Sequence, residues 1–121
     1  MYEYKFELIK VIDGDTVDGY IDLGFDVKVK KRIRLLGINA PETRMQSKIK
    51  DLRERKRQKS LGLLAKKYLT DYLKDATIII QTKLDKRGKY GRTLGVIYVK
   101  KNETLINVND LLVSEGLAEE Y

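Results

Sequence analysis

Apolar and polar residues alternate through the first third of the chain. The alternation occurs in three stretches, Tyr4–Ile12, Val17–Leu23 and Val27–Ile38. A period of two residues is typical of strands that bury one face. Asp13-Gly14 and the segment Leu23–Asp26 separate the stretches and have the composition of turns. The pattern therefore predicts a β-meander of three strands.

The clearest helical pattern follows Ser60. Apolar residues recur at helical spacing from Leu61 to Leu73, and the Ser60 side chain is suited to cap the first turn. The preceding segment, Lys48–Lys59, is rich in charged residues. We therefore predict a helix that starts at Ser60, and for Lys48–Lys59 we favour a mobile, solvated loop over a defined binding element.

Two more strands and a second helix are expected in the last part of the chain. Thr77–Ile80 and Thr93–Val99 are rich in β-branched residues, and the polar loop Lys83–Gly91 separates them. Asn107 is suited to cap a short helix that runs through Glu115. Gly116 then stands where a residue in the left-handed conformation commonly ends a helix.

This order of three strands, a helix, two strands and a helix is compatible with a closed barrel. In such a barrel the first helix bridges the third and fourth strands. The expected fold class is therefore α+β and mainly β, a five-stranded OB-fold β-barrel with two or more flanking helices. We expect residues 1–121 to form a single domain of this kind, since 121 residues is an ordinary domain length.

The absence of two residue types excludes several kinds of site. The chain contains no Cys and no His, so the usual zinc ligand sets are excluded and any metal must be a hard cation bound through oxygen. Ser-His and Cys-His nucleophile pairs are excluded for the same reason. Catalysis would therefore depend on carboxylates, Lys, Arg, Tyr or a metal ion.

The distribution of apolar residues bears on localisation. No apolar run approaches the roughly 18 to 20 residues that a membrane-spanning helix needs, and the N-terminus has no signal-like apolar segment. We therefore expect a cytoplasmic protein with no membrane partner. An upstream segment that had been removed would leave secretion open.

The charge of the chain favours a polyanionic partner. The formal net charge is +7, and the isoelectric point is about 9.5. Residues Arg44–Lys67 contain ten Lys and Arg residues against two acidic residues, so the excess lies in one stretch. A basic segment of this kind is typical of proteins that bind nucleic acid.

Three short segments have the residue types of a phosphate and cation site: Asp13–Thr16, Arg34–Thr43 and Lys89–Arg92. Taken singly, each is also an ordinary turn or strand end. A hairpin that turns near Gly24 would place Asp15 beside Arg34 or Leu35, at the end of the sheet where the third strand also ends. Carboxylate and amide oxygens would then meet an arginine there.

Phosphodiester cleavage requires such a combination of groups. The reaction needs an activated water and a way to stabilise the negative charge that builds up on phosphorus in the transition state. Arginines bind phosphate oxygens through two hydrogen bonds, a hard cation bridges carboxylate and phosphate, and a free carboxylate orders or deprotonates water.

The same segments resemble the three signature blocks of the staphylococcal nuclease family, in order and in spacing. The blocks are Val11–Val17, Arg34–Glu42 and Lys89–Arg92, and Leu112–Tyr121 is similar to the helix and exit that follow in the family. The resemblance implies an OB-fold nuclease of the thermonuclease type. Such an enzyme uses Ca²⁺ to hydrolyse DNA or RNA and leaves 3′-phosphate ends.

The resemblance also implies a metal site. By position, Asp15 would be a carboxylate ligand of Ca²⁺, and Ala40 would offer its backbone carbonyl oxygen to the same ion. Asn39 stands where the best-known member has a second aspartate ligand. An amide oxygen still coordinates Ca²⁺ but removes one negative charge, so the affinity should fall or the ion preference should change.

The catalytic and substrate-binding roles follow in the same way. The resemblance implies that Arg34 and Arg92 hold the scissile phosphate and that Glu42 is the general base. Lys89 and Tyr90 would contact a neighbouring phosphate. The implied partners are DNA and RNA, with single-stranded or flexible segments preferred, and we expect a monomer.

Two other readings compete with the nuclease. Degenerate copies of this fold serve as catalytically silent domains that bind nucleic acid or protein. A purely structural small basic protein is the third reading. We favour the nuclease because Asp15, Arg34, Glu42 and Arg92 are all present, and because two carboxylates near a phosphate would repel it on a mere binding surface.

Overall fold

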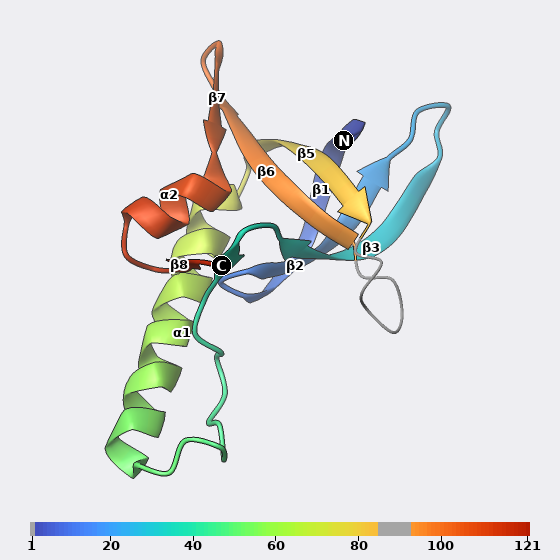
Figure 1. Ribbon diagram of the computed structural model, residues 1–121. Coiled ribbons are helices and arrows are strands. Elements are labelled where there is room, and N and C mark those ends of the chain that lie inside the picture. The colour runs from blue at the N-terminus through green and yellow to red at the C-terminus, as the bar shows by residue number, and fades with distance from the viewer. Residues whose placement is uncertain (1, 85–92) are drawn as a thin grey trace.

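Five strands close into a barrel in the computed structural model, which describes residues 2–84 and 93–121. Neighbouring strands pair antiparallel in the order β3, β2, β1, β5, β6, and a parallel pairing between β3 and β6 closes the ring (Figure 1). The strands are β1 (Tyr2–Asp13), β2 (Thr16–Asp22), β3 (Lys28–Leu35), β5 (Thr77–Leu84) and β6 (Thr93–Lys101). The predicted mainly-β, five-stranded OB-type barrel is confirmed.

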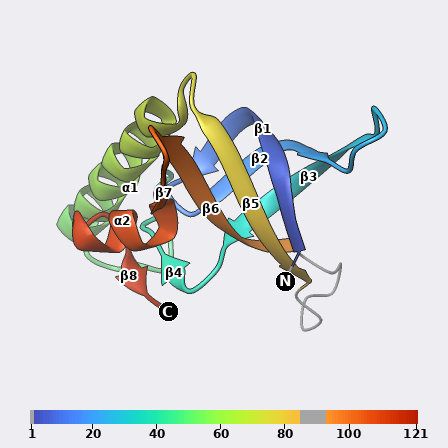
Figure 2. The same ribbon diagram turned by 90° about the horizontal axis from the view of Figure 1, so that it is seen from above.

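The alternating residues of these strands form the core of the barrel. Val17, Ile33, Ile80 and Ile97 come from four different strands and have no solvent exposure. Because side chains on a strand point alternately to its two faces, this inner row leaves the intervening polar residues outside. Figure 2 shows the barrel with α1 (Leu52–Leu73) packed on one side, opposite the projecting β2–β3 hairpin.

Three short strands were not predicted from the sequence. They are β4 (Ile38–Asn39), β7 (Thr104–Asn107) and β8 (Glu119–Glu120). The predicted third strand continues to Ile38, but β3 ends at Leu35, and Gly37 has a φ of 79° that breaks the strand. β4 instead pairs with β8. Strands of two to four residues are too short for a period of two to be visible.

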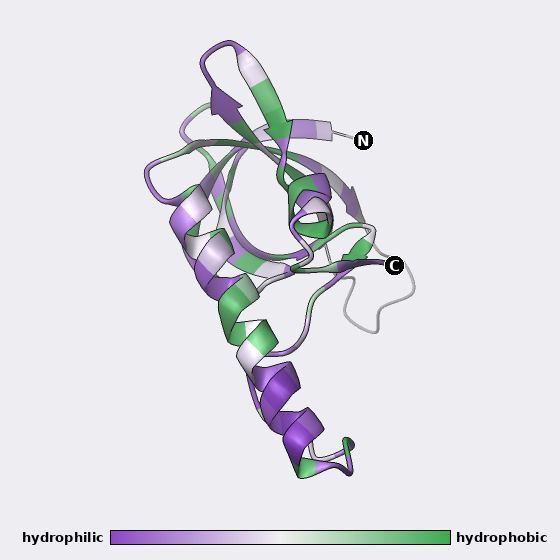
Figure 3. Ribbon diagram, turned by 90° about the vertical axis from the view of Figure 1, so that its left-hand side faces the viewer, coloured by the Kyte–Doolittle hydropathy of each residue, from purple (hydrophilic) through white to green (hydrophobic). Residues whose placement is uncertain are grey.

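The helix α1 begins eight residues before the predicted start at Ser60, so that prediction is wrong. Asp51 is the N-cap, and its side chain accepts a hydrogen bond from the Arg53 backbone N–H at 2.9 Å. Residues 52–59 of the predicted loop are therefore helical. The first turns project beyond the barrel and are hydrophilic (Figure 3), so they lack the apolar spacing that marks a packed helix.

The second half of α1 packs on the barrel through small and aliphatic residues. Gly62, Ala65, Leu69 and Leu73 are buried, and the spacing of three to four residues places them on one face. Within the described residues, neither helix has the length and hydropathy that crossing a membrane requires.

The second helix, α2 (Val108–Ser114), lies where the sequence predicts it, between Asn107 and Glu115. Asn107 is the N-cap and accepts a hydrogen bond from the Asp110 backbone N–H at 3.1 Å. Gly116 follows with a φ of 72°, the left-handed conformation that was expected there.

A buried Asn109 side chain attaches α2 to the barrel. Its Nδ2 donates to the carbonyl oxygens of Leu36 (2.9 Å) and Gly95 (3.1 Å), and its Oδ1 accepts from the Ile97 backbone N–H. A buried amide with all its groups paired fixes the elements that it joins. Asn109 therefore positions the segment between β3 and β4, which leads into the candidate site.

Candidate active site

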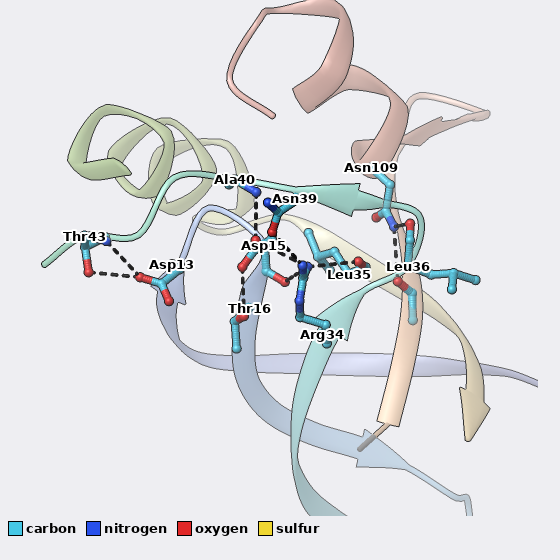
Figure 4. Close-up of polar contacts among 11 residues, drawn as sticks. Asp13, Asp15, Thr16, Arg34, Leu35, Leu36, Asn39, Ala40, Thr43 and Asn109 are labelled. Atoms are coloured by element: carbon cyan, nitrogen blue, oxygen red, sulfur yellow. Dashed lines mark hydrogen bonds and ion pairs between the residues drawn. The ribbon is translucent and has the colours of Figure 1, made fainter. Parts of the chain in front are cut away.

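The candidate site lies at the turn between β1 and β2, where the Asp15 side chain is only slightly exposed (Figure 4). Asp15 Oδ2 accepts a hydrogen bond from the Ala40 backbone N–H at 2.8 Å. Asp15 Oδ1 accepts from Thr16 Oγ1 at 3.0 Å. Burial of a carboxylate is costly unless its oxygens are paired, and these donors reduce the cost. They also hold the β1–β2 turn against the segment that follows β4.

Arg34 joins Asp15 to Asn39. Its Nη1 lies 3.3 Å from Asp15 Oδ2, and its Nη2 donates to Asn39 Oδ1 at 3.0 Å. The Arg34 side chain is 20% exposed, against 9% for the Asp15 side chain. The guanidinium is therefore held from inside by the carboxylate while part of it still reaches solvent. This arrangement suits an arginine that binds an anion from solution.

The predicted hairpin register is nearly correct. Thr16, and not Asp15, lies opposite Arg34, because Asp15 belongs to the turn. The Leu35 backbone N–H donates to the Asp15 carbonyl oxygen at 2.8 Å, which confirms the predicted neighbourhood of Asp15 and Leu35. The structure thus brings together Asp15, Arg34, Asn39 and Ala40.

A second contact fixes the loop that carries Glu42. Asp13 Oδ1 accepts hydrogen bonds from Thr43 Oγ1 at 2.9 Å and from the Thr43 backbone N–H at 3.3 Å. Asp13 and Thr43 belong to the segments singled out in the sequence, but their pairing was not predicted. Together with the contact between Asp15 and Ala40, this pair holds both ends of the segment 40–43 to the β1–β2 turn.

Close backbone packing completes the support of the loop. A Cβ atom added at Gly62 would collide with the carbonyl groups of Pro41 and Glu42, the Pro41 oxygen being 2.7 Å away. A Cβ atom at Gly14 would meet Ala65 Cβ at 2.7 Å and Ala40 Cβ at 3.0 Å. Two glycines therefore let α1, the turn and the loop approach one another. The close approach at Gly62 was not predicted, although a glycine inside a helical pattern is a signal of one.

We expect Gly62→Ala to destabilise the protein by about 1–2 kcal/mol, because overpacking against backbone costs more than the gain in helix propensity. Urea denaturation measures the free energy of unfolding. Ser60→Ala, an exposed position in the same helix, is the matched control and should raise stability by a few tenths of a kcal/mol. A gain in stability for Gly62→Ala would contradict the close approach.

Glu42 lies near the cluster but outside its hydrogen bonds. Its carboxylate is half-exposed and lies 3.5 Å from Arg44 Nε. Within the described residues, the polar contacts of the Arg34 guanidinium go to Asp15, Leu35 and Asn39. Glu42 and Asn39 both line a groove of about 610 Å³ between α1, the loop and the segment after α2. The groove leaves room for a ligand beside both residues.

Three of the predicted site residues, Lys89, Tyr90 and Arg92, lie outside the described residues. Their roles stay predictions.

The donor set at the cluster fits a hard cation by its chemistry. Asp15 offers carboxylate oxygens and Asn39 offers an amide oxygen, and the hydrogen bond from the Ala40 backbone N–H to Asp15 brings the Ala40 peptide next to them. In residues 2–84 and 93–121, no three acidic side chains cluster as a metal-binding group. A cation held by these residues would therefore receive one full negative charge from Asp15.

The next arginine on β3 has a different environment. Arg32 Nε and Nη2 donate to Asp18 at 2.8 and 3.1 Å across the β2–β3 pair. This hydrogen bond lowers the pKa of the Asp18 carboxyl below its ordinary value of 3.8 and raises that of Arg32. Asp18 is thus a fully ionised, dedicated counterion of Arg32 near neutral pH. Asp15, by contrast, divides its oxygens among three donors.

A closed five-stranded barrel whose first long helix bridges β4 and β5 defines an OB-fold domain, here with a polar cluster at the β1–β2 turn. The chain belongs to the staphylococcal nuclease family. The family model described as staphylococcal nuclease homologue matches residues 32–121. The resemblance stated from the sequence motifs is thereby confirmed.

Similar proteins align over nearly the whole chain. An uncharacterized protein of Methanocaldococcus jannaschii is 32% identical over 128 residues, covering 98% of this chain and 59% of that protein. The micrococcal nuclease of Shigella flexneri is 27% identical over 125 residues, covering 98% and 59%. The thermonuclease of Staphylococcus hyicus is 27% identical over 116 residues, covering 96% and 59%. The chain thus spans about three fifths of the length of these relatives.

Proposed function

We propose that the protein is a Ca²⁺-dependent nuclease that hydrolyses phosphodiester bonds of DNA or RNA and leaves 3′-phosphate ends. The observation that carries the proposal is the cluster of Asp15, Arg34 and Asn39, in which a partly exposed guanidinium is held by a buried carboxylate. Membership of the staphylococcal nuclease family and the similarity to two proteins named as nucleases support it.

The charges of the cluster favour an enzyme over a silent binding domain. Asp15 is buried and Glu42 is half-exposed on the adjoining loop. Both carboxylates repel a polyanion, so a site evolved only for binding would gain by losing them. In a hydrolase each has a use, since one holds a cation and the other acts on water.

In this proposal Arg34 binds the scissile phosphate. To do so its Nη2 exchanges the Asn39 oxygen for a phosphate oxygen, while Nη1 stays beside Asp15 Oδ2, which orients the guanidinium from inside. The negative charge that builds up on the phosphate in the transition state strengthens that contact. By the family resemblance, Arg92 is the second phosphate ligand, and Lys89 and Tyr90 contact the neighbouring phosphate.

Glu42 is proposed as the general base. The fixed loop between Ala40 and Thr43 carries it, and Glu42 lines the same groove as Asn39. Its present partner, Arg44, has a side chain that is 86% exposed, so the ion pair is weak and releases the carboxylate readily. Glu42 is therefore free to accept a proton from a water that attacks phosphorus.

Asp15, Asn39 and the Ala40 carbonyl are the residues proposed to hold Ca²⁺. The ion would supply charge stabilisation for the phosphate oxygens when it is bound. Because Asn39 adds no charge, we infer a weaker hold than two aspartates would give.

The decisive experiment is the hydrolysis of single-stranded DNA and RNA with added Ca²⁺ and with a chelator. We expect cleavage with Ca²⁺, 3′-phosphate ends on the products, and loss of cleavage in chelator. Circular dichroism is the control and should show a folded chain in both conditions, because the barrel core does not depend on the site. Binding without cleavage in Ca²⁺ would instead support the silent OB-fold domain. Undiminished cleavage after rigorous chelation would refute the metal assignment.

A further inference from the structure

The tip of the β2–β3 hairpin presents apolar side chains to solvent. Phe25 is 99% exposed, and Leu23 and Val27 on either side of the turn are also exposed. Figures 1 and 2 show the hairpin extending away from the barrel, on the side opposite α1. Exposure of a phenylalanine and its aliphatic neighbours to water is unfavourable. When such residues form one contiguous patch, the patch often marks an interaction site.

The turn is ordered, and it displays Phe25 at the cost of backbone strain. Three hydrogen bonds fix the turn. The Leu23 N–H donates to the Val27 carbonyl oxygen, and the Val27 N–H donates to the Gly24 carbonyl oxygen, both at 2.9 Å. The Gly24 N–H donates to Asp22 Oδ1 at 2.8 Å. Phe25 has a φ of 53°, in the left-handed region that a bulky residue seldom adopts. Strain of this kind, held by the surrounding hydrogen bonds, is typical of functional positions.

A row of basic side chains connects this tip with the candidate active site. Ile33 and Leu35 on β3 point into the core, so the alternate positions point outward. All of these outward positions from the hairpin to the site are basic: Lys28, Lys30, Arg32 and Arg34. Lys30 lies opposite the exposed Tyr20 on β2. We call these four residues the β3 basic row.

We propose that the outer face of the β2–β3 hairpin is a second binding site for single-stranded nucleic acid, in which the phosphates follow the β3 basic row and a base stacks on Phe25. The inference rests on the proposed function only for the end of the row at Arg34. Alternating cations and exposed aromatic residues are the combination that recognises a single strand, because cations bind phosphates and rings stack on bases.

Continuity with Arg34 favours nucleic acid over a lipid surface. A membrane-binding hairpin needs basic residues only around its tip, whereas this row runs on to the cluster with Asp15. Besides Arg34, which lies beside Asp15, counterions orient two further members of the row, since Lys28 Nζ lies 2.9 Å from Glu7 and Arg32 is bonded to Asp18. Their side chains are 49% and 62% exposed, so each can still reach a phosphate.

The length of the row makes the proposal specific. Arg34 lies six residues from Lys28, which is roughly 20 Å along a strand, and Phe25 lies beyond it. Nucleotides of one strand in a duplex are spaced about 3.4 Å apart. Even if a single strand is stretched to twice that spacing, three nucleotides cover only about 20 Å. A trinucleotide anchored at Arg34 therefore cannot reach Phe25, but a longer strand can.

The test uses Phe25→Ala and Phe25→Trp, with Leu105→Ala and Leu105→Trp as matched controls. Leu105 is an exposed apolar residue on β7, outside both sites. The chain has no tryptophan, so each Trp variant carries a single fluorescent reporter. The probes are a labelled single-stranded DNA of about 16 nucleotides, the upper site size of an OB fold, a trinucleotide, and anionic phospholipid vesicles. Binding is measured in chelator, so that it does not depend on cleavage.

We expect Phe25→Ala to weaken binding of the long strand about five- to tenfold, near the lower end for loss of one stacked base, with no change for Leu105→Ala. The emission of Phe25→Trp should be quenched by the long strand, by the trinucleotide only at higher concentration because it makes fewer phosphate contacts, and not by the vesicles. Unchanged affinity of Phe25→Ala, or quenching of Leu105→Trp to the same degree, would overturn the proposal. A response to vesicles alone would make the tip a membrane contact and would also overturn the proposal. A protein that binds in this way but never cleaves would refute the proposed function alone.

Discussion

Arg34→Ala is expected to lower kcat for single-stranded DNA by roughly 100- to 1000-fold, the usual cost of removing one donor aimed at transition-state charge. The reason is the geometry of the cluster. Asp15 and Asn39 hold the guanidinium, and its exposed part is free to meet a phosphate. Since the contact strengthens as charge builds up on the phosphate, kcat should fall more than KM rises.

The same substitution has a structural cost that must be measured separately. Without Arg34, the buried Asp15 carboxylate keeps Ala40 and Thr16 as donors but loses its cation. We expect a loss of roughly 1–3 kcal/mol in the free energy of unfolding, the cost of a buried group that loses a charged partner. Urea denaturation of the variant shows whether enough stability remains for the kinetics to be read at the assay temperature.

Two further variants separate chemistry from stability. Arg34→Lys keeps the cation for Asp15 but loses the second nitrogen that contacts phosphate, so it should recover stability more than kcat. Arg53→Ala removes an exposed arginine from the first turn of α1 and should change neither. If folded Arg34→Ala and Arg34→Lys both turn over at the rate of the unmodified protein, Arg34 has no part in catalysis, and the silent binding domain becomes the better account.

The strands could be predicted from the sequence where a periodic pattern of apolar residues coincides with a face that packs in the core. The alternation of apolar and polar residues in the first third of the chain arises because each strand there has one face buried in the barrel. Val17 and Ile33, which have no solvent exposure, lie on these buried faces. The hairpin register followed from the turn at Gly24 and placed Asp15 near Leu35 correctly. The cluster with Arg34 could therefore be anticipated from residues far apart in the chain.

Prediction failed where a helix forms without a buried apolar face. The first turns of α1 project from the barrel, so residues 52–59 show no apolar spacing although they are helical. The signal present was local: Asp51 as N-cap, and Glu54 accepting hydrogen bonds from Arg57 and Gln58 one turn later. The prediction of a loop depends on high charge alone, and charge does not distinguish a solvated helix from a loop.

The partners in tertiary contacts were also beyond prediction, even where the residue type was itself a signal. Gly62 allows α1 to touch the carbonyl groups of Pro41 and Glu42, and Asn109 ties α2 to the carbonyl of Leu36. Each depends on which backbone groups a side chain meets after folding. A single sequence specifies the residue type at such a position but not the partner.

Glu42→Gln is expected to lower kcat by roughly 100- to 10,000-fold, the range for removing a positioned general base. Glutamine keeps the size of the side chain and its capacity to accept hydrogen bonds, but it cannot take a proton from water. KM should stay the same or fall slightly, because the substitution removes a charge that repels phosphate and no contact that attracts it.

The structure makes Glu42 the more direct of the two tests. Its ion pair with Arg44 is exposed on both sides, and pairs of this kind contribute about 0–1 kcal/mol, so the variant should stay folded. Glu120→Gln, on the neighbouring strand β8 and also exposed, removes the same charge outside the groove and serves as the control. A loss of rate in Glu42→Gln that is absent in Glu120→Gln points to the function of this one carboxylate. Equal rates in the two folded variants would mean that another group accepts the proton. Glu42 would then have no part in catalysis.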